Sequence, residues 1–374
     1  MTTDTKAWKK LFTEVIDAGL CTLCGVCSGF CPYLAYHKGR IAILDNCDLA
    51  NDSQCYQYCP RTFTDLDALS RTVFGSPYYH EPVGQAKKIV IARSSDVRIR
   101  TKAQYGGVVT TALSFALEKG LVDAVLLAKT PADKVPQPFL ARDMESLMQC
   151  TGSNYMACPV LYGYNQFPRE GLISGGKLAI VATPCQVLAI SKMKHKPPQN
   201  RFSVDGIKMV IGLFCTWALA PDRFYVFMKE VVDLADVTKF DVPPPPANRF
   251  DVYTTSGIVS LPLEQVRQFT MPGCAYCTDM TSEFADISIG AAEGIEGWNT
   301  VIIRTEVGEE LWQALISNGK IEVSELPAQN LDHLKEAALL KKKRALNELR
   351  KKSGDPKNLL YLGLSPDWVE KLLI

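Results

Sequence analysis

The pattern of apolar and polar residues changes near residue 85 of the chain. Before that point, residues 5–18 show apolar positions at helical spacing and residues 40–45 form a short strand-like run. After it, buried-strand runs alternate with helical segments. The strand-like runs cover residues 87–93, 122–128, 177–182 and 207–214, and the helical segments cover residues 106–118 and 186–193. This alternation predicts an α/β domain with a largely parallel or mixed sheet.

Two further changes in pattern divide the chain. Residues 75–84 are rich in turn formers and are interpreted as a linker, and residues 243–246 form a proline-rich break before a short β segment at 250–263. The sequence therefore predicts three parts. They are a bacterial-ferredoxin-like α+β module at residues 1–80, a mixed-sheet α/β domain at 85–330 and a helical tail at 331–374.

The helical tail carries two basic runs, at residues 341–344 and 350–352. We interpret them as a solvated helix face with cations near a helix C-terminus, where the helix dipole favours positive charge. Docking of this face onto an acidic partner subunit is the alternative.

Composition narrows the class of protein. The chain has 374 residues and a formal net charge of +1, so no general attraction to nucleic acid or to acidic membranes is expected. We find no signal peptide and no apolar run that approaches the length of about 18 residues needed to span a membrane. Thirteen cysteines without a secretion signal favour reduced thiols that bind metal. The expected location is the cytoplasm.

A run of four cysteines near the N-terminus is the most specific motif. It reads Cys21-Thr-Leu-Cys24-Gly-Val-Cys27-Ser-Gly-Phe-Cys31-Pro32. This spacing is typical of bacterial ferredoxins, in which three thiolates bind one iron–sulfur cluster and the fourth reaches a second cluster. The sequence therefore predicts a protein that carries electrons.

A second cysteine group follows at Cys47, Cys55 and Cys59, and it departs from the two-cluster pattern because Leu44 occupies the position of one expected ligand. The first cluster can be completed by Cys21, Cys24, Cys27 and Cys59. The second would then have only Cys31, Cys47 and Cys55. It is a [3Fe–4S] centre, or it takes an oxygen ligand from Asp45 or Asp48, or the loop folds differently and the module holds one cluster.

Four more cysteines lie in the α/β region. Cys185 and Cys215 each follow a predicted strand, and Cys274 and Cys277 form a Cys-x-x-Cys pair. These thiols can meet at the carboxyl edge of the sheet, where α/β folds bind cofactors. Spacing favours an iron–sulfur cluster and leaves zinc as the alternative. Cys150 and Cys158 show no ligand pattern and are interpreted as small buried hydrophobic residues.

Several segments of the α/β region resemble the beta subunits of coenzyme F420-dependent hydrogenase and formate dehydrogenase, and their relatives. The resemblance extends from about residue 85 to about residue 315. It is carried by residues 97–111, 152–155, 182–186, 274–294 and 297–305. Tyr105 stands where many members of the family have an acidic residue, and Asn154 stands where some have a basic one. Both departures leave the preferred hydride donor open.

The resemblance implies a bound FAD with a four-cysteine [4Fe–4S] cluster near it. It also implies a set of residues that face the flavin or its phosphates: Gln104, Gly106, Gly107, Thr110, Thr111, Ser153, Asn154, Tyr155 and Gly290. Paired glycines that open a helix are compatible with this role, because they let backbone N–H groups approach a pyrophosphate at the positive end of the helix.

Taken together, the motifs and the resemblance predict an iron–sulfur flavoprotein subunit. We expect it to exchange a hydride between a soluble carrier, foremost coenzyme F420, and FAD, and to pass single electrons through two or three clusters. Expected partners are hydrogenase, formate dehydrogenase, heterodisulfide-reductase-like or quinone-reducing subunits. The alternatives are an NAD(P)H-linked subunit, although no Gly-x-Gly-x-x-Gly follows a strand, a stand-alone reductase of a small organic substrate, and a relay protein without flavin.

Overall fold

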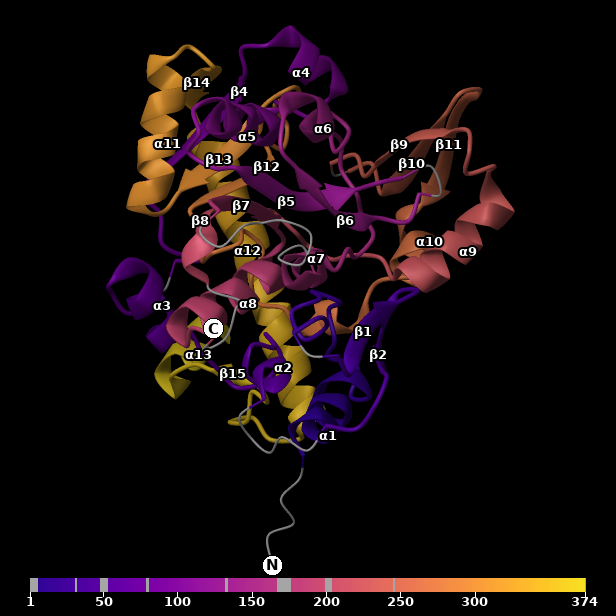
Figure 1. Cartoon of the computed structure of the whole chain (residues 1–374), viewed down its shortest axis with the longest axis vertical. Coiled ribbons are helices and arrows are strands. Elements are labelled where there is room, and N and C mark those ends of the chain that lie inside the picture. Colours follow the sequence, from indigo (N-terminus) through magenta and orange to yellow (C-terminus); the bar gives the residue numbers. More distant parts are fainter. Residues whose placement is uncertain are drawn as a thin grey trace, which may run out of the picture.

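The computed structural model describes residues 6–30, 32–47, 53–78, 81–131, 134–166, 176–198, 204–244 and 246–373. Within these ranges a mixed eight-stranded sheet has the strand order β14-β4-β13-β12-β8-β7-β5-β6 (Figure 1). Its strands are β4 (Lys88–Ser94), β5 (Ala124–Lys129), β6 (Gln137–Ala141), β7 (Leu178–Ala182), β8 (Ile207–Leu213), β12 (Ile287–Ala291), β13 (Asn299–Ile303) and β14 (Ile321–Glu325). The neighbours β12, β8, β7 and β5 run parallel, whereas the other pairs are antiparallel. The predicted mixed α/β fold is confirmed.

Helices cover both faces of this sheet, which explains why its central strands are apolar throughout. All five residues of β7 are buried, and the neighbours Ile180 and Val181 belong to different apolar cores. One core contains residues of α5 (Val108–Glu118), α6 (Met144–Met148) and α11 (Glu306–Ser317). The other contains residues of α7 (Val160–Gln166), α8 (Pro184–His195) and α12 (Ala328–Ser353).

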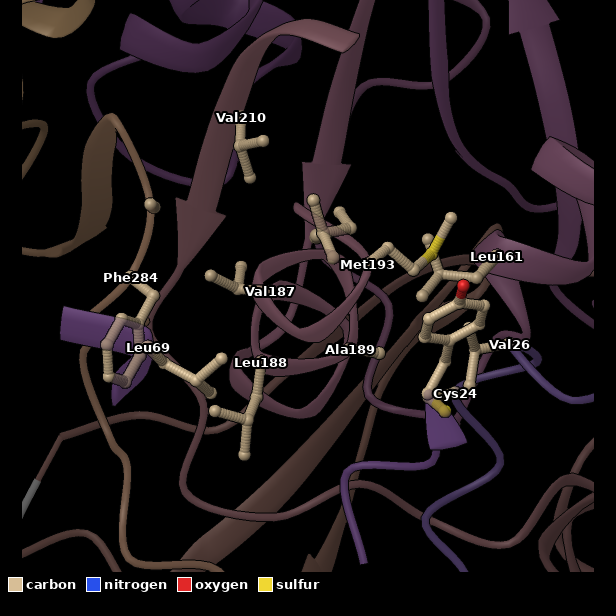
Figure 2. Packing of buried hydrophobic residues seen from close by; sticks show 14 of the residues in the cluster. Cys24, Val26, Leu69, Leu161, Val187, Leu188, Ala189, Met193, Val210 and Phe284 are labelled. Atoms are coloured by element: carbon tan, nitrogen blue, oxygen red, sulfur yellow. The ribbon is translucent and has the colours of Figure 1, made fainter. Parts of the chain in front are cut away.

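The cysteine-rich N-terminal module shares the second of these cores. Its elements are α1 (Ala7–Leu11), the π-helix η1 (Phe12–Ile16), β1 (Leu34–His37), β2 (Arg40–Ile43), α2 (Gln54–Gln57), β3 (Thr64–Asp65) and α3 (Leu66–Phe74). Figure 2 shows residues of the module packed with those of α7 and α8, among them Cys24, Val26, Leu69, Leu161, Val187, Leu188 and Ala189. The predicted helix and strand of this module are present, and the module is joined to the α/β domain through a continuous apolar core.

Gly25 lies at a close approach between the module and the α/β domain. Its φ is +88°, and a Cβ at this position would lie 2.6 Å from the backbone nitrogen of Tyr162 in α7. Glycine is required here both by the left-handed backbone and by the lack of space. The cysteine loop is therefore seated directly on the α/β domain.

The segment interpreted as a linker is packed where the structure describes it. Tyr78 donates a hydrogen bond to Oε2 of Glu283 over 2.5 Å, and the buried Val83 accepts one from Thr281 through its carbonyl. Buried contacts fix these residues to the loop that precedes β12.

The C-terminal tail is helical, as predicted, and consists of α12, the two-residue strand β15 (Leu362–Gly363) and α13 (Pro366–Leu373). Helix α12 runs from the level of the sheet to the N-terminal module in Figure 1, and β15 pairs in parallel with β3. Lys341 and Lys342 are only 4% and 2% exposed. The interpretation of a solvated basic face is wrong for these two residues, whereas Lys351 and Lys352 are exposed.

A separate antiparallel sheet stands to one side of the central sheet (Figure 1). It has the order β11-β10-β9 and consists of β9 (Val237–Asp241), β10 (Arg249–Thr254) and β11 (Gly257–Pro262). Its apolar core includes residues of α9 (Pro221–Val231) and α10 (Leu263–Arg267). The β segment predicted at 250–263 is thus a hairpin. The short helices α4 (Val97–Lys102), η3 (Val204–Gly206) and η4 (Pro272–Tyr276) lie in connecting segments. Within the described ranges, no helix has both the length and the apolar character that a bilayer crossing requires.

Candidate functional site

A cavity of about 1060 Å³ opens at the carboxyl edge of the sheet. It is lined by residues that directly follow three parallel strands, namely Thr130 after β5, Thr183 after β7 and Phe214 after β8. This edge is where open α/β sheets bind ligands. Cofactor and drug-sized pockets usually measure about 300–1,000 Å³, so the cavity has room for a large cofactor.

Seven of the nine residues predicted to face the flavin line this cavity. They are Gln104, Gly107, Thr110, Ser153, Asn154, Tyr155 and Gly290. The other two, Gly106 and Thr111, lie behind its wall. A Cβ on Gly106 would lie 2.8 Å from the carbonyl oxygen of Ala92, and Thr111 donates a hydrogen bond to Oγ of Ser94 over 2.7 Å. Gly106 and Thr111 therefore pack against β4, Gly106 from the loop before α5 and Thr111 from α5 itself.

The N-terminus of α5 points its first residues into the cavity. Gly107 is its N-cap, with φ of +75°, and the following residues Val108, Val109 and Thr110 also line the cavity. The first N–H groups of a helix lack intrahelical acceptors and lie at the positive end of the helix dipole. This end of the cavity is therefore suited to a phosphate group.

Asp241 at the end of β9 holds two residues of the cavity wall, Gln104 and Tyr155, and no motif in the sequence indicates this role. Its Oδ1 accepts a hydrogen bond from Nε2 of Gln104 over 2.6 Å and one from the Tyr155 hydroxyl over 3.4 Å. Burial, and then the Asp241 carboxylate, raise the pKa of Tyr105 to about 12. The Oε1 atom of Gln104 is buried and has no partner among the described residues, so it remains available as an acceptor.

The four cysteines predicted from the strand ends and the Cys-x-x-Cys pair all line the same cavity: Cys185, Cys215, Cys274 and Cys277. We call them the sheet-edge group. Besides burial, Cys274, Cys185 and Cys277 raise the pKa of Cys215, and Cys277 and Cys185 raise the pKa of Cys274. Burial raises the pKa of Cys274 to about 11. For Cys277, burial raises the pKa, but the nearby cations Lys341 and Arg61 outweigh it and lower the pKa overall.

The N-terminal cysteines form a second group. Cys21, Cys24, Cys27 and Cys59, here called the loop group, line a small apolar cavity beside Leu11 and Val15. Burial is the main cause that raises the pKa of Cys21 to about 11 and the pKa values of Cys24 and Cys27 well above the usual range. A bound metal cluster deprotonates such thiols outright, because its positive charge dominates the local field.

The remaining predicted ligands are placed differently. Cys55 is buried, with its sulfur 3.1 Å from Oγ of Ser53, and Cys47 lies outside both cavities, with its carbonyl accepting from the Trp8 indole. Cys31 and Asp48 lie outside the described residues. Cys150 and Cys158 line the large cavity without a ligand pattern.

All twelve described cysteines are free thiols. Among the described residues, no three His, Cys, Asp or Glu side chains converge closely enough to hold a single metal ion. The loop group and the sheet-edge group are therefore defined by their shared cavities and mutual electrostatic effects.

The two cysteine groups touch through their backbones. A Cβ on Gly273 would lie 2.3 Å from the carbonyl oxygen of Leu20 and 2.5 Å from that of Cys21. Cys185 of the sheet-edge group also raises the pKa values of Cys21 and Cys24 in the loop group. The two groups are thus neighbours across a contact in which Gly273 leaves no room for a side chain.

Buried cations accompany each group. Nζ of Lys192 donates to the carbonyl of Cys59 over 2.7 Å, and burial is the main cause that lowers its pKa to about 8. Nζ of Lys341 donates to the carbonyls of Cys215 and Asp279 over 2.5 and 2.6 Å. Such cations offset the negative charge of thiolates, and so the donor set and its surroundings fit iron–sulfur clusters.

Comparison with known proteins agrees with this geometry. Two family models match the chain, and both describe the coenzyme F420 hydrogenase/dehydrogenase beta subunit. The model of its N-terminal part matches residues 89–163, and the model of its C-terminal part matches residues 175–329. The chain belongs to the coenzyme F420 hydrogenase/dehydrogenase beta subunit family. A 4Fe–4S binding domain model also matches residues 14–37. The resemblance found in the sequence is confirmed, and the protein is an oxidoreductase of this family with an iron–sulfur module.

The most informative relatives differ in how much of them the chain spans. It is 31% identical to the coenzyme F420 hydrogenase subunit beta of Methanothermobacter thermautotrophicus, over 73% of the chain and 98% of the relative. It is 28% identical to the coenzyme F420-dependent sulfite reductase of Methanocaldococcus jannaschii, over 92% of the chain but only 52% of the relative. A chain of the F420-reducing [NiFe] hydrogenase complex from Methanosarcina barkeri superposes with a TM-score of 0.67 at 28% identity, covering 72% of this chain and 93% of that one.

Proposed function

We propose that this protein is an electron-input or electron-output subunit that binds FAD in the large cavity and [4Fe–4S] clusters on its two cysteine groups. Reduced coenzyme F420 is the proposed hydride donor, because the F420-linked relatives cover nearly all of the α/β domain. Bound FAD would supply the exchange between a two-electron hydride and the single electrons that iron–sulfur clusters carry. The continuity of one cavity from the α5 N-terminus to the sheet-edge group supports the proposal most directly.

The residues of the cavity wall have distinct tasks in this proposal. The N-terminus of α5, with Gly107 and Thr110, would hold the phosphate end of the cofactor. Gln104, fixed by Asp241, presents its free carbonyl oxygen as an acceptor for a ring N–H. Leu127, Val181 and Ile289 supply apolar wall that excludes water from the site.

In this proposal, the loop group lies nearer to a partner protein than the sheet-edge group does. One large apolar side chain is exposed close in sequence to its cysteines: Phe63, four residues after Cys59, is 71% exposed. In the same N-terminal module, Leu44 is 65% exposed. Exposed apolar residues next to a redox centre are suited to docking another protein. We propose a hydrogenase-type redox subunit as that partner, in line with the relatives.

The test begins with anaerobic protein whose flavin and iron have been quantified. Reduced coenzyme F420, NADH and NADPH are then offered separately while flavin bleaching and cluster absorbance are followed. We expect bleaching by reduced F420 alone. Bleaching by a nicotinamide alone would overturn the proposed carrier, and purified complex without flavin would overturn the proposed cofactor.

A variant that fills the large cavity tests whether the flavin binds there. Thr110→Trp places a large ring at the N-terminus of α5, and we expect it to lose flavin while it retains iron. Ser317→Trp, at the end of α11 and outside the cavity wall, is the matched control and should retain both. Equal flavin content in the two variants would contradict the assignment of this cavity.

A further inference from the structure

Arg61 is a buried arginine that lies between the two cysteine groups. It directly follows Cys59 and Pro60 in the chain, it is only 3% exposed, and it lines both the large cavity of the sheet-edge group and the small cavity of the loop group. Neither the family resemblance nor the cysteine spacing points to this residue.

The contacts of Arg61 include no carboxylate among the described residues. Its terminal nitrogens donate to the carbonyls of Pro60 and Gly273, each over 3.4 Å, and its guanidinium carbon lies 4.9 Å from the centre of the Tyr361 ring. Arg61 and Cys277 both line the large cavity. Its Nε atom is buried and has no partner within the described part of the chain.

A buried cation without a carboxylate is costly unless other negative charge faces it. The groups that can supply this charge are thiolates on both sides. Arg61 lines the large cavity together with Cys185 and Cys277 of the sheet-edge group, and it lines the small cavity together with Cys21 and Cys59 of the loop group. Tyr361 stays neutral, because burial raises its pKa.

We propose that Arg61, which borders both cavities and donates a hydrogen bond to the carbonyl of Gly273 next to Cys274, is a positioning residue that raises the reduction potentials of both clusters together. The inference rests on the proposed clusters, but it requires neither FAD nor coenzyme F420. Positive charge close to a cluster favours its reduced form, and hydrogen bonds to ligand sulfurs act in the same direction. A cation shared by two clusters therefore raises both potentials in the same direction and changes the difference between them less than a cation beside one cluster alone would.

Lys192 and Lys341 provide matched controls, because Lys192 donates to a carbonyl of the loop group and Lys341 to one of the sheet-edge group. Lys192 acts on Cys59 and Cys24 of the loop group, and Lys341 acts on Cys277, Cys215 and Cys274 of the sheet-edge group. If charge is what matters, removing either lysine shifts one cluster. Removing the Arg61 charge shifts both.

The experiment is an anaerobic redox titration of the full-length chain with dithionite, followed by electron paramagnetic resonance. The reaction reduces each cluster by one electron taken from dithionite, and no bond to the protein forms or breaks. For Arg61→Met we expect the equilibrium constant for reduction of each cluster to fall about tenfold, which is about 59 mV for one electron. Arg61→Lys should stay near the wild type, and Lys192→Met and Lys341→Met should each shift a single signal.

The outcomes separate cleanly. A shift of only one signal in Arg61→Met, or an equal shift in Arg61→Lys, overturns the inference. If Arg61→Met loses iron, Arg61→Gln is titrated as a second neutral variant. Loss of iron from both groups in both neutral variants, with iron retained in Arg61→Lys, supports the shared charge, and loss from one group alone overturns it. Wild-type protein that shows both signals but is not reduced by F420 contradicts the proposed function and leaves this inference standing.

Discussion

The loop group and the sheet-edge group show two opposite ways to bring four thiols together. Three cysteines of the loop group lie on one short loop, and only Cys59 comes from elsewhere. The sheet-edge group draws Cys185 from the start of α8, Cys215 from the end of β8, and Cys274 and Cys277 from the segment around η4. The first group therefore depends on how a loop is seated, whereas the second depends on the register of the central sheet.

The comparison teaches that a local motif can still depend on distant parts of the fold. The loop group is recognisable from spacing alone, yet its loop is held by Gly25 against α7 and by Gly273 against the sheet-edge group. Lys192 of α8 donates to the carbonyl of Cys59. The α/β domain thus supplies both the seat and part of the charge for a module that looks independent in sequence.

The largest expected effect comes from removing one sheet-edge thiol. Cys277→Ala should abolish the cluster of that group while the loop group keeps its own, so that roughly half of the iron is lost, since ligand loss removes a cluster but not its neighbour. Iron analysis and electron paramagnetic resonance measure this. Cys150→Ala, which removes a thiol from the same cavity without a ligand pattern, should keep all the iron. Loss of both clusters in Cys277→Ala would show that the groups do not assemble separately.

The next effect tests how the tail is fixed beside the sheet-edge group. Nζ of the buried Lys342 is paired with Glu283, so Lys342→Met leaves that carboxylate buried without its cation. Removing one partner of a buried pair costs about 3–5 kcal/mol. Urea titration of Lys342→Met and of the wild type measures this loss as a difference in the free energy of unfolding. Lys351→Met, at an exposed position of the same helix, should change the free energy of unfolding by less than about 0.5 kcal/mol. Equal losses in the two variants would show that the Lys342–Glu283 pair does not stabilise the fold.

A smaller effect is expected at the contact between the two groups. Gly273→Ala forces a Cβ onto the carbonyls of Leu20 and Cys21, and overpacking of this kind typically costs about 1–3 kcal/mol. We also expect slower electron exchange between the clusters, measured by stopped-flow or freeze-quench spectroscopy. Gly319→Ala has a positive φ but open space around the added Cβ, so it should lose about 1 kcal/mol without any change in electron exchange.

The smallest effect is expected at Tyr105, which lines the large cavity, and it concerns how stability depends on pH. Burial raises the pKa of Tyr105 to about 12, above the ordinary tyrosine value of about 10. The folded state then keeps a proton that the unfolded state loses, so this group makes stability fall as pH rises from about 10 to 12. Tyr105→Phe should flatten that decline in a series of urea titrations at different pH. Parallel curves for variant and wild type would contradict the assignment.

Much of the fold could be predicted because its signals are local. The buried strands of the parallel region are continuous apolar runs, and the two cysteines that follow β7 and β8 share an edge of the sheet by the geometry of parallel strands. The prediction failed at Lys341 and Lys342, because a lysine run on a helix looks the same in sequence whether buried oxygens of the protein or water molecules accept its hydrogen bonds. Asp241 and Arg61 could not be found, since their partners lie far away in the chain.

The pairing of β15 with β3 has a consequence for how the protein is made. Thr64 pairs with Leu362, and Tyr361 supplies the ring over which Arg61 lies. A ribosome completes the N-terminal cysteines long before it reaches these residues, although N-terminal segments usually fold first during synthesis. The loop group therefore acquires its full surroundings only after Tyr361 and Leu362 have been translated, and a cluster bound there would be enclosed no earlier than that.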